Sequence, residues 1–151
     1  MNRLITRTAS ETMALAARLG RRARALDVVC LAGELGAGKT TFVQGFARGA
    51  GFRGRATSPT FGIARNYKAR RVALHHLDLY RVGPRDIVNL GLEEYLEDPQ
   101  AACLIEWPEA ARKALPADRL EILFEHRPDG GRSVELRALG PRSRRLLGAR
   151  A

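Results

Sequence analysis

The sequence predicts an α/β domain of three layers, in which helices cover both faces of a mixed, mostly parallel sheet. Short apolar segments that are typical of buried strands alternate with amphipathic segments that are typical of helices. The segment 28–32 is apolar throughout, which is typical of a central parallel strand that is buried on both faces. Two further pairs of strand-like segments flank polar turns, and these predict antiparallel hairpins.

The first half of the chain begins with a helix that starts at a capping box. The hydroxyl of Thr8 and the carboxylate of Glu11 have the spacing that satisfies free N–H groups in a first helical turn, so a helix is expected from Thr8 to about Arg24. After the strand over 28–32, glycines precede a second helix over 39–49, whose apolar residues fall on one face.

The second half alternates in the same way. The predicted elements, in chain order, are strands at 61–67 and 71–79 that form a hairpin, a helical region at 84–96 with a break at Gly91, a strand at 101–105, a short helix at 109–114, and a hairpin of strands at 120–125 and 133–139. We expect one domain over 1–140 and a basic, frayed C-terminal tail over 141–151.

Composition excludes several classes of protein. With 45% hydrophobic and 28% charged residues, the chain of 151 residues is expected to fold rather than to remain disordered. It has no apolar stretch long enough for a membrane helix, and its N-terminus lacks the apolar core of a secretion signal, so a cytoplasmic protein is expected. Cys30 and Cys103 lie in apolar runs and are expected to be buried, reduced thiols.

Charge is distributed unevenly along the chain. The net charge is +10, and 23 of the 26 basic residues are arginine. Residues 1–77 carry a net charge of +11, residues 78–136 carry −6, and the last 15 residues carry +5. This asymmetry indicates either a basic face with an acidic face or a basic arm, and binding of a polyanion is one use of such a surface. The alternative is an arginine-rich composition with solvated surface charge.

The most informative motif is Gly33-Glu-Leu-Gly-Ala-Gly-Lys-Thr40, which matches the phosphate-binding P-loop pattern GxxxxGK[ST]. It follows an apolar strand and opens an amphipathic helix, as a P-loop does, so the domain is expected to be P-loop NTPase-like. Lys39 is expected to contact the β- and γ-phosphates of a nucleotide and to be exposed when the loop is empty, and the Thr40 hydroxyl is expected to bind Mg²⁺.

Two carboxylates follow apolar strands and are candidates to complete the site. Asp78 ends the strand over 71–79, and Glu106 follows the strand over 101–105. Ligands of open α/β sheets bind at the carboxyl ends of strands, which favours a role in holding Mg²⁺ or orienting water. Either residue could instead pair with a surface arginine.

Two other features have open interpretations. The hydroxyl-rich segment 57–61 is either a sensor that orders when a γ-phosphate is present or a plain turn. His75 and His76 lie in a predicted strand, so one of them points inward, where a structural role is favoured over a catalytic one.

Taken in order, these motifs resemble the TsaE (YjeE) family of bacterial P-loop ATPases of tRNA threonylcarbamoyladenosine synthesis. The resemblance covers about residues 5–110 and rests on GELGAGKTT, SPTF, HLDLYR over 76–81, GLEEYL over 91–96, and IEWP over 105–108. It implies an ATPase that supports formation of N6-threonylcarbamoyladenosine at position 37 of tRNAs that read codons starting with A.

The resemblance also implies partners, cofactors and residue roles. The partners are a complex of a TsaD-type transferase with a TsaB-type subunit, through which tRNA is contacted indirectly, and no membrane is involved. The cofactors are ATP and Mg²⁺. By matching motifs, the resemblance implies that Asp78, Lys39 and Glu106 are catalytic, that Thr40 and Glu106 bind the metal, and that Trp107 lies beside the site. It implies that the phosphates are held by Gly36, Ala37, Gly38, Lys39, Thr40 and Thr41. The N-terminal segment of the family approaches the adenine, which makes residues 8–12 candidates for this contact, although no motif marks them.

Other functions remain open from the residues alone. A small-molecule P-loop kinase would need an acceptor pocket and a lid with arginines, and no clear lid insertion occurs. A GTPase is disfavoured because the guanine motif NKxD is absent. A basic nucleic-acid-binding module fits the charge but lacks a recognised nucleic-acid-binding motif. The motifs do not identify an arginine finger, the arginine that stabilises the transferring phosphate, although Arg81 is a candidate.

Overall fold

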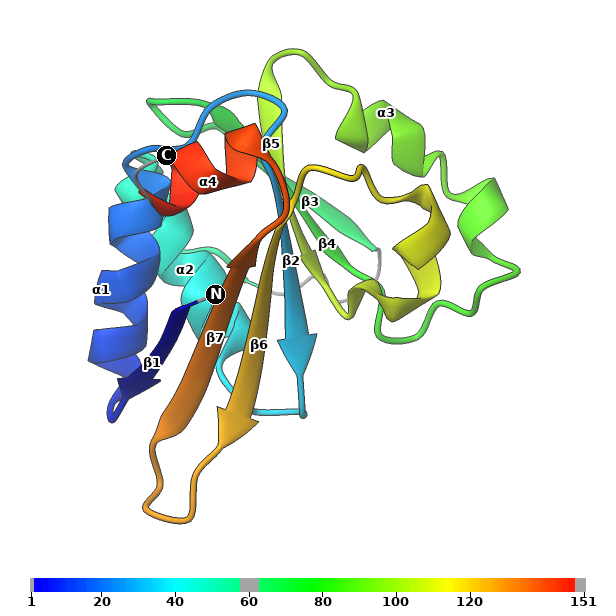
Figure 1. Cartoon of the computed structure of the whole chain (residues 1–151). Helices are drawn as coiled ribbons and strands as arrows, with labels where there is room; N and C mark the ends of the chain where they lie inside the picture. Colours follow the sequence, from blue (N-terminus) through cyan, green and yellow to red (C-terminus); the bar gives the residue numbers. More distant parts are fainter. Residues whose placement is uncertain (1, 58–62, 149–151) are drawn as a thin grey trace.

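The computed structural model describes residues 2–57 and 63–148. A single sheet runs through the molecule, and helices lie on both sides of it (Figure 1). The elements are β1 (Asn2–Thr6), α1 (Ala9–Gly20), β2 (Val28–Gly33), α2 (Lys39–Gly49), β3 (Ala64–Tyr67), β4 (Ala73–Asp78), the 3₁₀ helix η1 (Ile87–Asn89), α3 (Leu92–Leu96), β5 (Ala101–Glu106), the 3₁₀ helix η2 (Pro108–Ala114), β6 (Leu120–His126), β7 (Arg132–Ala138) and α4 (Pro141–Leu147).

The sheet is mixed, with a parallel centre, as the sequence predicts. Its strand order is β1-β7-β6-β2-β5-β4-β3. The four central strands, β6, β2, β5 and β4, pair in parallel, whereas the hairpins β6–β7 and β3–β4 and the pair β1–β7 are antiparallel. Parallel pairing aligns the carboxyl ends of β2, β4 and β5 at one edge, so the residues that follow these strands lie close together.

Alternating residues of the central strands supply two hydrophobic cores, one on each face of the sheet. Val29 and Leu31 of β2 belong to the core that α1 and α2 cover, together with Phe42 and Phe46. Val28 and Cys30 belong to the opposite core, beside Cys103. Both cysteines are buried, free thiols, as expected, and burial raises the pKa of each to about 12.

α1 and α2 pack side by side at unusually close range, because glycines lie where they touch. A Cβ added at Gly45 would lie 2.4 Å from the carbonyl oxygen of Met13, and one at Gly49 would lie 2.1 Å from that of Ala17. The predicted cap holds α1 in place, since the Glu11 N–H donates to Thr8 Oγ1 at 3.1 Å. This helix pair fixes the direction in which α2 leaves the phosphate loop.

The two ends of the chain differ from the sequence-based expectation. No strand was expected at the N-terminus, yet β1 pairs with β7 along its whole length. The tail after Gly140 was expected to be frayed, and this is wrong for 141–147, which form α4. The Ser143 hydroxyl donates to Asp118 at 2.7 Å, and the buried side chain of Leu146 joins the core beneath α1 and α2, so both contacts hold α4 on the domain.

No helix within the described ranges 2–57 and 63–148 is long and apolar enough to cross a membrane.

Candidate functional site

The phosphate loop lies between the carboxyl end of β2 and the first residue of α2. Gly36 and Gly38 adopt φ angles of +74° and +116°, in the left-handed region where a side chain would be strained. At Gly33 a Cβ would lie 2.3 Å from the carbonyl oxygen of Phe124, so β6 also requires a glycine there. Gly38 caps α2 without a side chain, which leaves the first N–H groups of the helix available to an anion.

Lys39 is buried, contrary to the expectation that it would be exposed in an empty loop. Its side chain folds back, and Nζ donates to the carbonyl oxygens of Gly33 at 2.6 Å and Glu34 at 2.7 Å. The ammonium group also lies 4.1 Å from the centre of the Trp107 ring. Only 4% of Lys39 is exposed, and this burial lowers its pKa against the opposing attraction of Glu106.

Both predicted carboxylates lie at this loop. Asp78 and Glu106 are register partners on the adjacent parallel strands β4 and β5, and Glu106 is the register partner of Leu31 in β2. The Thr40 hydroxyl donates to Glu106 Oε1 at 3.1 Å. Neither carboxylate forms an ion pair with an arginine in the described part of the chain, so the alternative of a surface pair is wrong.

The environments of the two carboxylates differ. Asp78 is half-buried and accepts the Tyr80 N–H at 3.0 Å. Burial raises the pKa of Asp78 above its ordinary value, and the nearby charge of Glu106 acts in the same direction. Glu106 is buried, with both of its oxygens hydrogen-bonded to side chains.

His76 is the second partner of Glu106, and the sequence analysis did not find this contact. Its ring is fully buried, with Nε2 2.6 Å from Glu106 Oε2 and Nδ1 3.0 Å from the Tyr67 hydroxyl. An ionised carboxylate can only accept, so Nε2–H is the donor to Glu106. Of the two histidines, His76 points inward as expected, while His75 bonds to Asn66 and Asp98. Strand alternation identified one inward histidine, but only the register of β4 with β5 brings it to Glu106.

Aromatic side chains form one wall of the site. Trp107 has a φ of +56°, which turns its ring over Lys39, and the Tyr80 ring packs on it with a centroid separation of 4.8 Å. Together with the loop and the carboxylates they enclose a pocket of about 230 Å³. Trp107 was expected beside the site, whereas Tyr80 was not recognised. Arg81, the candidate arginine finger, is not among the described residues that line this pocket.

A second pocket, of about 130 Å³, lies on the other side of the phosphate loop. Its wall combines Gly36, Gly38 and Thr41 with Thr8, Ala9 and Thr12 of the N-terminal region, where an approach to adenine was expected. Arg132 in β7 also lines it and donates to the Gly36 carbonyl oxygen at 3.3 Å. Arg132 comes from the C-terminal hairpin, which carries no recognised motif, so no local pattern predicts its place at the loop. Of the proposed sensor over 57–61, all but Thr57 lies outside the described residues.

Comparisons with known proteins show which family the chain resembles. The family model for "Threonylcarbamoyl adenosine biosynthesis protein TsaE" matches residues 6–134. The chain is 40% identical to the TsaE protein of Bacillus subtilis over 132 residues, which cover 87% of this chain and 82% of that protein. It is 39% identical to the TsaE protein of Streptomyces coelicolor, over 85% of this chain and 90% of that protein.

A solved structure resembles the whole fold. The crystal structure of Bacillus subtilis YdiB superposes with a TM-score of 0.82 at 36% sequence identity, and the match covers 97% of this chain and 91% of that one. The similarity therefore extends beyond the phosphate loop to most of the fold.

Proposed function

Given that the chain belongs to the TsaE family, which acts in tRNA threonylcarbamoyladenosine biosynthesis, we propose that it is the ATP-binding and ATP-hydrolysing subunit of that pathway. Hydrolysis would support turnover of a complex between a TsaD-type transferase and a TsaB-type partner in the cytoplasm. The product would be N6-threonylcarbamoyladenosine at position 37 of tRNAs that read codons starting with A. The observation that carries the proposal is that Lys39, Asp78 and Glu106 meet at one phosphate loop.

The residues of the site fit ATP and Mg²⁺. A Cβ added at Gly36 would meet no atom within 4 Å, so the space in front of the loop is open to a phosphate. Thr40 and Glu106 offer a hydroxyl and a carboxylate, the oxygen donors that Mg²⁺ prefers. The described residues contain no cluster of three or more metal-binding side chains, which suits an ion that takes its remaining ligands from phosphates and water.

Each residue has a distinct task in this proposal. Phosphate oxygens are bound by backbone N–H groups of the loop and of the first turn of α2. The residues that supply them are Gly36, Ala37, Gly38, Lys39, Thr40 and Thr41. Lys39 Nζ exchanges its two carbonyl partners for oxygens of the β- and γ-phosphates. Thr40 and Glu106 would hold Mg²⁺, which when bound neutralises charge on the phosphates. His76 fixes the orientation of the Glu106 carboxylate through Nε2–H.

Asp78 orients the attacking water. Its carboxylate is half-buried at the same strand edge as Glu106. No side chain among the described residues donates a hydrogen bond to it, and its one partner among them is the Tyr80 N–H. Because burial raises its pKa, it is a stronger base than an exposed aspartate. The pocket beside Thr8 and Thr12 would receive the nucleoside.

Two isosteric variants test this division of tasks. Glu106→Gln removes the charge that would hold the metal, so tight ATP binding should require a higher Mg²⁺ concentration. Asp78→Asn should bind ATP with near-normal affinity but hydrolyse it slowly. Trp107 supplies the readout, because it is the only tryptophan in the chain and lies over Lys39. Its emission should change when ATP is added.

The same titration can contradict the proposal. Equal binding defects in both variants would show that the carboxylates do not divide the work. A Trp107 emission that ATP leaves unchanged in the unmodified protein would place the nucleotide away from this strand edge.

A further inference from the structure

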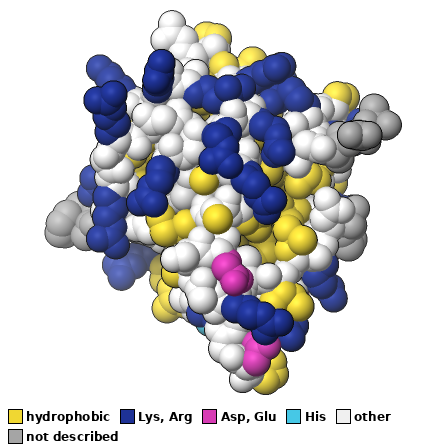
Figure 2. All heavy atoms as spheres, turned by 90° about the vertical axis from the view of Figure 1, so that its left-hand side faces the viewer, with side chains coloured by type: hydrophobic (Ala, Val, Ile, Leu, Met, Phe, Trp, Pro, Cys, Tyr) yellow, Lys and Arg dark blue, Asp and Glu magenta, His cyan; other side chains and the backbone are white. Residues whose placement is uncertain are grey.

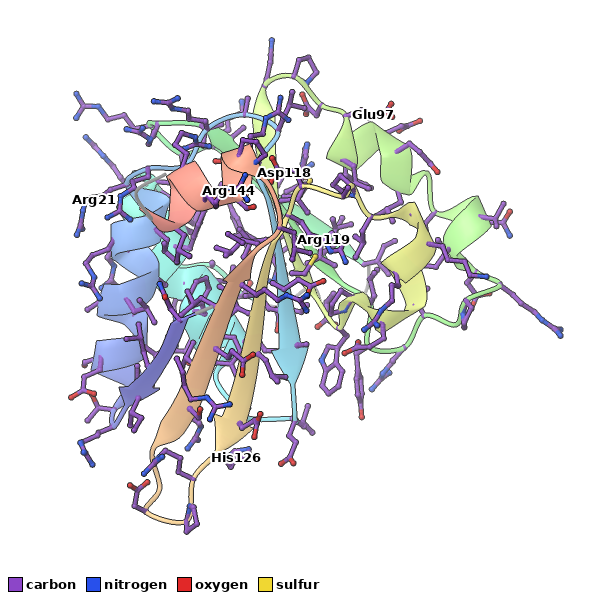
Figure 3. The ribbon with its side chains drawn as sticks, in the orientation of Figure 1. Arg21, Glu97, Asp118, Arg119, His126 and Arg144 are labelled. Atoms are coloured by element: carbon purple, nitrogen blue, oxygen red, sulfur yellow. The ribbon has the colours of Figure 1, made fainter. Side chains whose placement is uncertain are left out.

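The end of the molecule opposite the phosphate loop carries a dense group of exposed arginines. We define the arginine end by Arg21, Arg22, Arg24, Arg48, Arg70 and Arg144, all of which are exposed. They come from the C-terminal ends of α1 and α2, the turn before β4, and α4. Figure 3 labels Arg21 and Arg144 at this upper end, whereas His126 marks the lower tip of β6, beside the phosphate loop.

Hydrogen bonds bring these four segments together. The Arg71 N–H donates to the Ala50 carbonyl oxygen at 2.8 Å, and Arg71 Nε donates to that of Ala23 at 2.7 Å. Arg145 Nη1 donates to the Arg22 carbonyl oxygen at 2.7 Å, and Arg22 Nη1 donates to that of Leu146 at 3.4 Å. The arginine end is therefore a surface built by the fold, although its residues are far apart in the sequence.

The charge of this surface is not neutralised by nearby carboxylates. None of its six guanidinium groups forms an ion pair with any residue in the described ranges. Asp27, at the same end, is buried and paired with Arg145, while Asp118 binds the first turn of α4. In Figure 2, Lys and Arg side chains crowd the upper part of the face, and the acidic side chains in view lie in its lower part.

The composition of this surface distinguishes between kinds of polyanion. Protein interfaces present an apolar centre, whereas nucleic-acid contacts are made mainly by cations on phosphates. The six residues that define the arginine end are all arginines, although Arg21 at its margin shares a groove with the exposed side chains of Leu4 and Ile5. The other large apolar side chains that the described chain exposes lie outside this surface, and they are Leu35, Tyr80, Val88 and Leu123. Guanidinium groups, moreover, match the geometry of phosphate oxygens.

We propose that the arginine end binds the phosphodiester backbone of RNA directly and without sequence preference. Since the family acts in tRNA modification, tRNA is the RNA of first interest. The proposal departs from the expectation that tRNA is contacted only through partner proteins. It rests on the family and on the arginine surface, and it does not require that the chain hydrolyse ATP.

RNA at this surface would not compete with nucleotide. The phosphate loop follows the carboxyl end of β2, whereas the segment that carries Arg21, Arg22 and Arg24 leads into its amino end. The six residues of β2 separate the two by about 20 Å. Binding of RNA and binding of ATP are therefore measurable as independent events.

Charge reversal at two positions tests the proposal. The variant Arg21→Glu/Arg144→Glu changes exposed side chains of the arginine end, and Arg85→Glu/Lys113→Glu changes net charge equally at exposed positions outside it. Dissociation constants for a tRNA transcript and for poly(U) are measured over a range of salt concentrations. We expect the first variant to weaken binding of both RNAs at least tenfold at low salt, and the slope of log affinity against log salt to fall by about two. The control should lose much less.

A second double variant tests the same surface in case the first variant does not fold. Arg24→Gln/Arg48→Gln introduces no new charge and should lower the salt slope by a similar amount. Trp107 emission on ATP addition should be unchanged in all three variants, which separates this proposal from the ATPase proposal.

Three outcomes would overturn the proposal. Equal losses in the arginine-end variants and the control would mean that net charge alone governs binding. Unchanged RNA binding in folded arginine-end variants would exclude this surface. Retained RNA binding with lost association to the TsaB–TsaD-type complex would assign the surface to an acidic protein.

Discussion

Lys39 lies against the Trp107 ring and donates its ammonium group to two carbonyl oxygens of its own loop, so it must leave these contacts to reach the phosphates of a nucleotide. Lys39→Ala should leave the fold intact, because it removes a buried charge rather than an apolar contact. It should cost about 2–4 kcal/mol of transition-state stabilisation, a loss of about 30- to 1,000-fold in ATP hydrolysis. Hydrolysis assays, with circular dichroism as the folding control, measure both effects, and near-normal activity in a folded variant would exclude the P-loop assignment.

The substitution Asp78→Asn, which should slow ATP hydrolysis, should at the same time raise the free energy of unfolding. Burial raises the pKa of Asp78, so the folded protein binds a proton here more readily than the unfolded chain does. This residue therefore lowers the free energy of unfolding as pH rises from the ordinary carboxyl value of 3.8 through the raised value. Asp78→Asn abolishes that loss and should unfold at higher urea concentration than the unmodified protein at neutral pH.

The difference between the two proteins should shrink as the pH is lowered through the raised pKa toward 3.8, and it should vanish below 3.8, where the carboxyl is protonated in both the folded and the unfolded state. Urea unfolding at a series of pH values measures it. A variant that is less stable at neutral pH, or a difference that does not change with pH, would contradict a cost of burying this charge.

At the scale of elements, the contact between α1 and α2 depends on glycine rather than on helix propensity. Gly49→Ala should favour the helix by about 1 kcal/mol from propensity alone. The added Cβ would lie 2.1 Å from the Ala17 carbonyl oxygen, however, so the two helices must separate. We expect a net loss of about 1–3 kcal/mol in the free energy of unfolding.

Gly83→Ala is the matched control. It lies between β4 and η1, its nearest neighbour is the flexible carboxylate of Asp86 at 3.3 Å, and its change should stay within about 0.5 kcal/mol. Chemical denaturation of both variants measures the difference. A stabilised Gly49→Ala protein would mean that the helices do not pack this closely.

Elements whose signals are local were predictable, and elements that depend on distant partners were not. The bounds of α2, Lys39–Gly49, follow from the glycine-rich loop, the apolar face and the glycine at its end, all within a few residues. β1 escaped prediction because its partner, β7, lies more than a hundred residues away in sequence. α4 was not predicted, because an arginine-rich segment with few apolar residues shows little helical pattern. This helix is held on the domain by Asp118 and by the core around Leu146, which are distant in sequence.

The candidate site divides in the same way. The phosphate loop, Asp78 and Glu106 could be found because each stands at the end of an apolar strand. His76 reaches the site through the register of β4 with β5, Tyr80 through its ring contact with Trp107, and Arg132 through the C-terminal hairpin. No local sequence motif predicts any of these three contacts. Contacts between residues of different elements can be identified only once the pairing of the strands is known.

At the scale of the whole molecule, no arginine is among the described residues that line the pocket beside Lys39, and the arginines at the phosphate loop, Arg7 and Arg132, line the separate pocket beside Thr8 and Thr12. An arginine that stabilises the transferring phosphate accelerates hydrolysis by about 10³–10⁵, in cis or from a partner. We therefore expect the isolated chain to be a poor ATPase. The uneven charge, +11 over residues 1–77 against −6 over 78–136, favours docking through complementary charge, which speeds association at low salt.

ATP hydrolysis by the purified chain, alone and with a TsaB–TsaD-type complex, tests the proposed function most directly. We predict weak turnover by the chain alone and clear stimulation by the complex. At subsaturating complex, the stimulation should decline as the salt concentration rises. Lys39→Ala in the same assay shows that the measured turnover belongs to this site. Vigorous turnover by the isolated chain that the complex leaves unchanged would contradict the proposal and favour a free-standing ATPase or kinase.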